Sequence, residues 1–576
     1  MSRVRFDVFE LDLAGGELRR GDTPIHLQPQ PSKVLMLLAS RAGELVSREE
    51  IQKQVWAGDT FVDFDQGLNY CIRQIRAALG DAAETPRFIE TVPRRGYRFL
   101  AGVTPAAAPA PGRAMLVVLP FQNLTGDPDE DYLSDGLTEE VIAQLARLNP
   151  EGLGVIARTS AMRYKRTDKS IEMIGRELAV SHALEGSLRR GDGRIRVTTQ
   201  LIRIGDRTHL WAESFDRGAG DILGLQADVA QAVAREIGIQ LTPQARVQLA
   251  SPRVVDPRVY EAYLKGRYFW KKRAREALLK SVQYFNQAIE IDSSYAPAYA
   301  GLADVYLTQL DYNYLPPREA FMLAERALFE GLRLDDMVAE PHTSLGHLRM
   351  HQFKWAAAEQ QFRRAIALNA GYDSAHYYYG NLLAAYGRFD AAIAEANRAL
   401  ELDPLAVNAR LNRLFILYMA RRYDRALEEI SEALELDPAH TPLYYHLGLV
   451  YERQGAYDRA IEAFQKVSLP SHSRGATVLA AIGYAHAKAG RRAEAAAILK
   501  QLEDLCAREY VSLYDLALLH LALNDSERAF ERLSKAYDDY SSFLPFLNVD
   551  ARFDEVRGDP RFRSLVERLN FPGEGL

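Results

Sequence analysis

The chain has 576 residues, of which 48% are hydrophobic and 26% charged, and its formal net charge is −6. This is more apolar material than one core can use, so we expect several folded domains. The net charge excludes a uniformly basic protein, so any nucleic-acid site must be a local patch of cations.

The cysteines and the hydropathy pattern indicate the compartment. Cys71 and Cys506 lie far apart in the sequence and match no metal or disulfide spacing, which suits a reducing environment. The sequence has no signal-peptide pattern, and no apolar run approaches the ~20 residues that a membrane span needs. We therefore expect a cytoplasmic protein that makes no membrane contact.

Three helices are predicted in the first 80 residues, at 31–43, 47–56 and 65–80. The second opens with Ser47 and Glu50, a capping-box pair in which each side chain satisfies an unpaired amide at the helix start. The third has Asp65 as its expected N-cap and ends at a glycine.

The third helix is amphipathic. At 100° per residue one stripe is apolar and must face the core; its members are Leu68, Ile72, Ile75 and Leu79. The outer face is rich in hydrogen-bond donors that suit base edges and phosphates. Its residues are Gln66, Tyr70, Arg73 and Gln74, flanked by Asn69 and Arg76.

A β-hairpin is predicted next, over residues 88–103, where two β-prone runs flank the tip Pro93-Arg94-Arg95-Gly96. From residue 66 to residue 98 the cations outnumber the acidic residues, which gives this segment a modest positive charge. A solvated charged face would account for that charge alone. The cations are Arg73, Arg76, Arg87, Arg94, Arg95 and Arg98, and the acidic residues are Asp81, Glu84 and Glu90.

The runs "IRQIRAALGD" and "FIETVPRRGYRF" together resemble the winged-helix domain of OmpR-type transcription regulators, over about residues 4–103. We assign residues 1–103 to this α+β domain. The resemblance implies that the third helix enters the major groove of double-stranded DNA and that the hairpin, or wing, reaches the adjacent minor groove. On the helix it implies DNA contacts by Asn69, Arg73, Gln74 and Arg76, with Gln66 and Tyr70 on the same face. On the wing it implies contacts by Thr91, Arg94, Arg95 and Tyr97.

Such regulators commonly carry a phosphoacceptor domain ahead of the winged helix. Here the module begins within a few residues of Met1, so we expect control to come from the rest of the chain. The resemblance also implies two copies on direct-repeat half-sites, which could form a homodimer on DNA.

A Pro/Ala-rich spacer at 104–114 precedes an α/β region at 115–242, in which strand-like and helical runs mix. This region resembles the amino-terminal part of TolB-like proteins, a module sometimes found with adenylate cyclases. Its acidic run "TGDPDED" lacks the spacing of a calcium loop, so a solvated turn is expected. Its cations could bind an anion, although a surface strand and turn is the simpler interpretation. These cations are Arg158, Arg163, Lys165 and Arg166.

From residue 256 onward the chain repeats with the 34-residue period of tetratricopeptide proteins, which it resembles. The period is carried by Asp335, Asn369, Asp403 and Asp437. We expect an all-α solenoid over 256–540, in which Gly346, Gly380 and Gly448 let paired helices approach closely, and a helical cap over 541–576.

In this repeat frame, aromatic, amide and cationic side chains fall on the concave face, which suits a protein or peptide partner. The alternative is packing against another part of the same chain. The expected groove residues are His347, Tyr377, Asn381, Asn408, Phe415, Tyr418, Tyr445 and Arg453. His347 and His351 lie one helical turn apart, but a polar lining is favoured over a metal site.

The sequence therefore predicts a multidomain chain: a winged helix-turn-helix, an α/β domain and a tetratricopeptide solenoid. The leading hypothesis is a one-component transcriptional regulator. The alternative is a scaffold or adaptor whose winged helix makes only nonspecific DNA or protein contacts. We find no phosphate loop, nucleophile elbow, paired-cysteine zinc site or HExxH motif, so we expect no enzyme activity, cofactor or metal.

Overall fold

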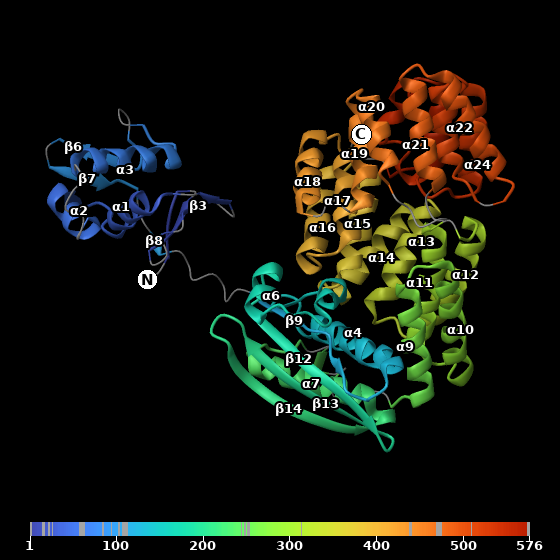
Figure 1. The fold of residues 1–576 in the computed structure, drawn as a ribbon, viewed down its shortest axis with the longest axis horizontal. Helices are drawn as coiled ribbons and strands as arrows, with labels where there is room; N and C mark the ends of the chain where they lie inside the picture. Colours follow the sequence, from blue (N-terminus) through green and yellow to red (C-terminus); the bar gives the residue numbers. More distant parts are fainter. Residues whose placement is uncertain are drawn as a thin grey trace. The chain divides into compact units, whose positions relative to one another are not determined.

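The computed structural model divides the chain into two compact units, Met1–Gly112 and Arg113–Leu576 (Figure 1). It describes residues 3–572 apart from 8, 14–15, 17, 21–22, 26, 57–63, 83–85, 94, 102–103, 106–112, 243–244, 247–248, 250–253, 313, 437–439, 468–474 and 509. Among the described helices, none is long and apolar enough to cross a lipid bilayer.

The first unit packs three helices between two small antiparallel sheets. The helices are α1 (Pro29–Ser40), α2 (Arg48–Val55) and α3 (Phe64–Leu79). One sheet has the order β4-β3-β2-β1-β8, from β1 (Arg3–Phe6), β2 (Phe9–Asp12), β3 (Leu18–Arg20), β4 (Thr23–Ile25) and β8 (Thr104–Pro105). The other has the order β5-β7-β6, from β5 (Leu45–Ser47), β6 (Ile89–Val92) and β7 (Gly96–Phe99).

The predicted core stripe of α3 is confirmed, since Leu68 and Ile75 are fully buried. The capping box of α2 is also confirmed, with Ser47 and Glu50 bonding reciprocally. The N-cap prediction for Asp65 is wrong. Helix α3 already begins at Phe64, and the Asp65 carboxylate instead accepts a hydrogen bond from the guanidinium of Arg48.

The hairpin depends on a glycine where β7 passes β5. A Cβ at Gly96 would lie 2.0 Å from the Val46 carbonyl oxygen and 2.9 Å from the Ser47 Cα. Because these are main-chain atoms, β5 and β7 would have to separate. We expect Gly96→Ala to destabilise the hairpin by about 3 kcal/mol, measured as faster amide hydrogen exchange in residues 88–100 of the full chain.

A matched control for that measurement is Gly67→Ala on α3, where the added methyl would meet Trp56 at an ordinary 3.6 Å. It should leave exchange in the hairpin unchanged. Equal exchange rates for Gly96→Ala and the wild-type chain would contradict the packing described.

The second unit begins with a sheet of order β11-β9-β12-β13-β14, with β10 beside β12. Its first strands pair in parallel, and β12, β13 and β14 form a long antiparallel meander. The strands are β9 (Ala114–Val118), β10 (Gln122–Asn123), β11 (Leu153–Val155), β12 (His182–Gly191), β13 (Arg194–Arg203) and β14 (Thr208–Gly218). The helices packed on them are α4 (Asp131–Leu148), α5 (Arg158–Ala161), α6 (Ile171–Leu178) and α7 (Ile222–Ile237).

Antiparallel helix pairs follow, eight of them in the described part of the chain. They are α9 (Pro257–Lys271) with α10 (Arg275–Ile291), α11 (Ala296–Asp311) with α12 (Pro317–Leu334), α13 (Ala339–His351) with α14 (Trp355–Leu368), α15 (Asp373–Ala385) with α16 (Phe389–Leu402), α17 (Val407–Met419) with α18 (Tyr423–Leu436), α19 (Thr441–Arg453) with α20 (Tyr457–Gln465), α21 (Gly475–Lys488) with α22 (Arg492–Leu505), and α23 (Leu513–Ala522) with α24 (Ser526–Asp538). Two 3₁₀ turns, η4 (Leu544–Phe546) and η5 (Ala551–Val556), lead to α25 (Pro560–Leu569).

Glycines sit where paired helices approach most closely, as predicted. A Cβ at Gly346 would lie 2.7 Å from the Phe362 ring, and one at Gly448 would lie 2.4 Å from the Phe464 ring. The glycine of one helix thus makes room for the phenylalanine of its partner helix, and a larger residue would push the pair apart.

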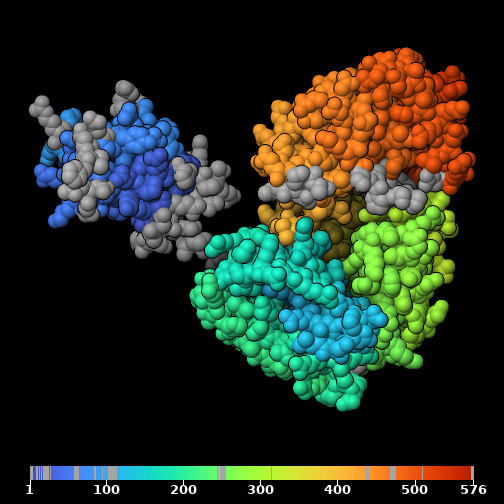
Figure 2. Space-filling view, in the orientation of Figure 1, coloured from blue at the N-terminus to red at the C-terminus, as the bar shows by residue number. Residues whose placement is uncertain are grey.

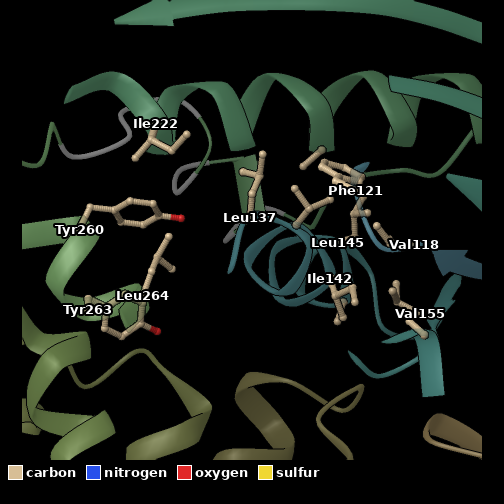
Figure 3. Packing of buried hydrophobic residues seen from close by; sticks show 14 of the residues in the cluster. Val118, Phe121, Leu137, Ile142, Leu145, Val155, Ile222, Tyr260, Tyr263 and Leu264 are labelled. Atoms are coloured by element: carbon tan, nitrogen blue, oxygen red, sulfur yellow. The ribbon is translucent and has the colours of Figure 1, made fainter. Parts of the chain in front are cut away.

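The α/β sheet and the first repeats share one hydrophobic core. Figure 3 shows Leu137 of α4 and Ile222 of α7 facing Tyr260 and Leu264 of α9. A Cβ at Gly136 would lie 2.5 Å from Leu264. The regions 115–242 and 256–540, which the sequence separates into domains, therefore pack as one body.

Polar contacts extend this junction further along the repeats. The buried Asp403, after α16, accepts a hydrogen bond of 2.8 Å from the Ser160 amide, and the Ala157 amide donates to the Leu402 carbonyl at 2.8 Å. Burial next to Asp373 raises the pKa of Asp403 to about 7. The α/β layer is thus bonded to the fourth helix pair as well as the first.

Candidate nucleic-acid interface

Helix α3 is bonded to the hairpin through Arg76. Its Nη2 donates to the Ile89 carbonyl at 2.8 Å and to the Thr91 hydroxyl at 3.0 Å. The Arg76 side chain is only 14% exposed, and its Nε lies 4.0 Å from Asp81. These contacts correct the expected DNA contact by Arg76: the residue fixes the hairpin against the helix.

A second set of bonds lies on the adjacent strand of the hairpin, where Tyr97 pairs with Thr91. The Tyr97 hydroxyl donates to Asn69 Oδ1 at 3.1 Å and accepts from Arg48 Nη2 at 3.2 Å. Tyr97 is 3% exposed, and burial raises the pKa of its hydroxyl. Tyr97 therefore positions Asn69, contrary to the expected wing contact with DNA.

Arg48 contributes contacts that no sequence pattern predicted. This residue follows the helix-capping Ser47, a position that shows where α2 starts but not where its side chain points. Its guanidinium reaches Asp65, Asn69 and Tyr97, so it joins α2, α3 and the hairpin.

Asp81 fixes the connection between α3 and the hairpin. Its carboxylate accepts hydrogen bonds from the amides of Arg87 at 2.7 Å and Ile89 at 2.9 Å. The start of β6 is thereby held to the end of α3, and the tip of the hairpin keeps its direction relative to the helix.

Ion pairs neutralise some of the arginines in this segment. Arg98 bonds Glu90 at 3.0 Å, and Arg87 bonds Asp7 at 2.8 Å. Arg73 on α3 and Arg95 at the hairpin tip are exposed, and neither has an ion pair with any described residue. Arg94 and the side chain of Gln66 lie outside what the structure describes.

We call the remaining exposed set the α3–wing surface. It consists of Asn69, Tyr70, Arg73, Gln74, Thr91 and Arg95. Tyr70 is 39% exposed, with its hydroxyl 3.4 Å from Gln28 Oε1. Arginine pairs with guanine edges, asparagine and glutamine pair with adenine, and hydroxyls bond phosphates. The surface therefore carries both base-reading and phosphate-binding groups.

Part of the concave face predicted to bind a partner is instead occupied by the chain itself. Phe415 packs edge-on against Phe546 of η4, with ring centroids 4.9 Å apart. Tyr418 is 2% exposed, and His347 is 4% exposed and stacked on Tyr378. The groove prediction is wrong for Phe415, Tyr418 and His347, because the C-terminal segment and neighbouring helices occupy the space. Of the other expected residues, Asn408 is exposed, and Tyr377, Asn381, Tyr445 and Arg453 are half-buried.

The C-terminal segment does more than cap the repeats. The Trp355 indole donates to the Leu569 carbonyl at 2.6 Å and stacks on Phe571 at 4.7 Å. Phe353 stacks on Tyr537 at 5.2 Å. The last helices thus return to α13 and α14.

His347 and His351 form a buried pair, with their Nε2 atoms 3.0 Å apart. Burial lowers the pKa of each to about 3, so both are neutral at physiological pH. Among the described residues no group of three or more ligating side chains could hold a metal ion.

Three of the four cations singled out in the α/β region, Arg158, Lys165 and Arg166, form ion pairs with acidic residues of the same region. Arg158 lies 3.4 Å from Glu139, and Lys165 bonds Asp131 at 3.0 Å and Asp135 at 2.7 Å. The acidic run is therefore only partly solvated, and this region offers no obvious anion site among its described residues.

Glu452, buried on α19, makes the stability of the second unit depend on pH. It is 3% exposed, and burial raises the pKa of its carboxyl to about 7. The folded state then binds more protons than the unfolded state between about pH 4.5 and pH 7. This part of the stability is present at low pH and is lost as pH rises through 7. We expect Glu452→Gln to stabilise the chain relative to wild type by about 3 kcal/mol at pH 8 and little at pH 4.5.

Thermal melting of the two proteins from pH 4.5 to pH 8 measures this difference. Comparing them isolates Glu452 from His347 and His351, whose lowered pKa values act in the opposite direction as pH falls. A difference in melting temperature that stays constant with pH would contradict the burial of an ionisable carboxyl here.

Three segments of the chain match known families. Residues 22–99 match the family "Transcriptional regulatory protein, C terminal". Residues 112–232 match "HilA/YgeH-like transcriptional regulator, second domain", and residues 343–407 and 416–473 match the tetratricopeptide repeat. The α/β region therefore finds its match in the HilA/YgeH-like second domain.

Three curated relatives are similar to this chain over different lengths. "Putative adenylate cyclase 3" of Rhizobium meliloti (strain 1021) is 34% identical over 223 residues, 38% of this chain and 38% of that protein. "Transcriptional regulator HilA" of Salmonella typhimurium is 25% identical over 418 residues, 72% of this chain and 73% of HilA. "Cholera toxin transcriptional activator" of Vibrio cholerae is 37% identical over 79 residues, 14% of this chain and 27% of that protein.

The chain thus spans well under two thirds of the first and third relatives and about three quarters of HilA. In one polypeptide, this chain is similar to the C-terminal domain of transcriptional regulatory proteins, to the second domain of HilA/YgeH-like regulators and to tetratricopeptide repeat proteins.

Proposed function

We propose that this chain is a transcription regulator that binds double-stranded DNA through the α3–wing surface. The observation that carries the proposal is that Arg73 and Arg95 are exposed and unpaired among the described residues, on two elements that Arg76 bonds together. Unpaired cations on a fixed frame lose little conformational entropy when they meet phosphates or bases.

The two elements would read different parts of the duplex. Helix α3 presents Asn69, Arg73 and Gln74, which suit the donor and acceptor pattern of the major groove. The hairpin tip presents Arg95, and an arginine entering a narrow minor groove meets a concentrated phosphate potential. Sequence specificity would then come mainly from the helix, and the wing would add affinity.

The second unit would supply recognition of an effector or a protein partner, which makes this a one-component regulator in the cytoplasm. Two copies on direct-repeat half-sites would gain from the raised effective concentration of the second winged helix. The resemblance of residues 115–242 to TolB-like proteins belongs to the same proposal and would serve this recognition role.

The rival function is a scaffold that touches DNA without sequence preference. Its binding would depend on charge alone, so its affinity would follow the salt concentration equally for every duplex. A regulator should prefer its site by about 10³-fold or more over random DNA.

Selection of genomic fragments with the full-length protein tests the proposal. The wild-type chain should enrich fragments that share a sequence motif, and Arg73→Ala/Arg95→Ala should enrich none. If both proteins recover the same random fragments, the DNA-binding role assigned to this surface is wrong.

A further inference from the structure

Helix α12 exposes two large apolar side chains to solvent. Met322 is 65% exposed and Phe329 is 53% exposed, and they lie seven residues apart. Figure 1 draws α12 and α10 along the outer side of the repeats, and Figure 2 shows this part of the surface in green. Side chains seven apart share one face of a helix, so these two form one apolar strip.

Arginines alternate with the apolar side chains along that face. At 100° per residue all members fall within an arc of about 80°. We call this set the α12 stripe; it consists of Arg318, Met322, Arg326, Phe329 and Arg333. Its spacings of four, four, three and four residues are those of a helix surface that packs against another helix.

Ion pairs with described residues neutralise only part of the positive charge of the α12 stripe. Arg318 donates from Nε and Nη2 to the Asp538 carbonyl at 2.9 and 2.7 Å, a contact that does not neutralise its charge. Arg326 is exposed and has no ion pair with any described residue. Arg333 bonds Glu330 at 3.0 Å. Two of the three arginines therefore remain without a carboxylate.

A shallow cavity of about 580 Å³ opens beside the stripe. Phe321 lies beneath it at 3% exposure and packs edge-on against Tyr540, with centroids 5.5 Å apart. Met322 and Phe329 line the same cavity. The rim also carries Arg318, Arg326, Gln352 and Glu325, and the Glu325 carboxylate is paired with Arg349. An aromatic floor below a mixed apolar and cationic rim suits a bulky apolar side chain inserted from a partner.

We propose that the α12 stripe is a docking surface for an acidic amphipathic helix of a protein partner. The helical spacing of the stripe suits a partner that is itself a helix. Its apolar side chains would contact an apolar strip on that helix, and its unpaired arginines would contact carboxylates beside that strip. A second copy of this chain fits poorly, because two α12 stripes face to face would set arginines against arginines.

The biological role of this docking surface rests on the proposed function, because a regulator bound to DNA would use the α12 stripe to recruit its partner. It also supplies a site for partner recognition outside the concave face, part of which the C-terminal segment occupies. DNA binding by the first unit and helix binding by α12 can fail independently.

The probe is a fluorescent peptide of about three heptads with leucine at the a and d positions and glutamate at e and g, titrated against the full-length chain. We expect saturable binding with a Kd in the micromolar range that weakens as salt rises. The same peptide with lysine in place of glutamate should bind at least tenfold more weakly.

Two double variants localise the site. Arg326→Glu/Phe329→Ser should weaken binding of the acidic peptide at least tenfold. The matched control is Leu279→Ser/Lys280→Glu on α10, where Leu279 is 53% exposed, the same fraction as Phe329; it should bind like wild type. Circular dichroism melting of both variants checks that the repeats stay folded.

Three results would overturn the proposal: no binding of the acidic peptide up to about 1 mM, equal binding of the lysine peptide, or equal loss in the α10 control. Binding of selected DNA is measured in parallel with each variant. If the wild-type chain binds the acidic peptide but does not bind DNA, the proposed function is wrong and the docking surface on α12 is still supported.

Discussion

Replacing Arg73 and Arg95 together by alanine should weaken binding of the full-length chain to a selected DNA fragment by about 100-fold at physiological salt. A bidentate arginine–guanine contact contributes about 1–3 kcal/mol of discrimination, and a minor-groove arginine adds a phosphate contact. The two side chains have no competing partner among the described residues, so most of that energy is available to DNA. Fluorescence anisotropy with a labelled duplex measures the loss.

The single variants should separate the two roles. Arg73→Ala should relax the preference for one base pair, and Arg95→Ala should reduce the slope of log affinity against log salt by about 1 while leaving specificity unchanged. Arg87→Ala is the control, because Arg87 is 68% exposed and already paired with Asp7; a loss of less than threefold is expected. A larger loss for Arg87 than for Arg73 and Arg95 would place the DNA elsewhere on the unit.

Arg552→Ala should destabilise the second unit by about 3–5 kcal/mol. The Arg552 guanidinium bonds Asp550 at 2.7 Å, with side chains 9% and 0% exposed, and Tyr514 donates to the same carboxylate at 2.7 Å. Removing the cation leaves a buried carboxylate that keeps two neutral donors, the Tyr514 hydroxyl and the main-chain amide of residue 552 at 2.9 Å. The pair lies in the segment that returns into the solenoid, so the contacts of that segment should loosen with it. Urea unfolding followed by circular dichroism measures the change.

The chain contains a matched control for this pair. Asp256 and Arg258 have the same spacing in sequence and the same 2.7 Å contact, but with side chains 34% and 76% exposed. Arg258→Ala should therefore change stability little, because water and salt screen an exposed pair. Arg552→Ala/Asp550→Asn should recover part of the loss. Equal small effects of Arg552→Ala and Arg258→Ala would show that burial does not govern this contact.

The elements of the interface could be predicted from the sequence, but its bonding could not. The period of Leu68, Ile72, Ile75 and Leu79 predicts α3 and its core face, since a helix must bury such a stripe. The same period places Arg76 at the edge of the outer face, where it could reach DNA or a neighbour. The folded structure is needed to show that Arg76 bonds the Ile89 carbonyl and the Thr91 hydroxyl of the hairpin.

The predicted DNA contact by Tyr97 was wrong for a related reason. Alternation in a hairpin predicts two faces without saying which one is covered, and Arg48 covers this one from another helix. The four strands before α1 went unpredicted because each has only three or four residues, too few to show alternation.

The groove prediction shows the limit of reasoning from a repeat. The repeat frame places Phe415 and Tyr418 on the concave face; Phe415 packs against Phe546, and Tyr418 is 2% exposed. The frame cannot predict that η4, far along the chain, fills the space in front of them, because no local pattern links Phe415 to Phe546. The exposed pair Met322 and Phe329 was detectable only from accessibility, since helix patterning alone would bury them.

The central claim is that the α3–wing surface recognises a DNA sequence. Its most direct test is an equilibrium titration of the full-length chain, at one salt concentration, with a selected duplex and with a scrambled duplex of the same composition. We expect the selected duplex to bind about 10³-fold or more tightly than the scrambled one, and Arg73→Ala to reduce this ratio at least tenfold. Equal affinities for the two duplexes would contradict the claim.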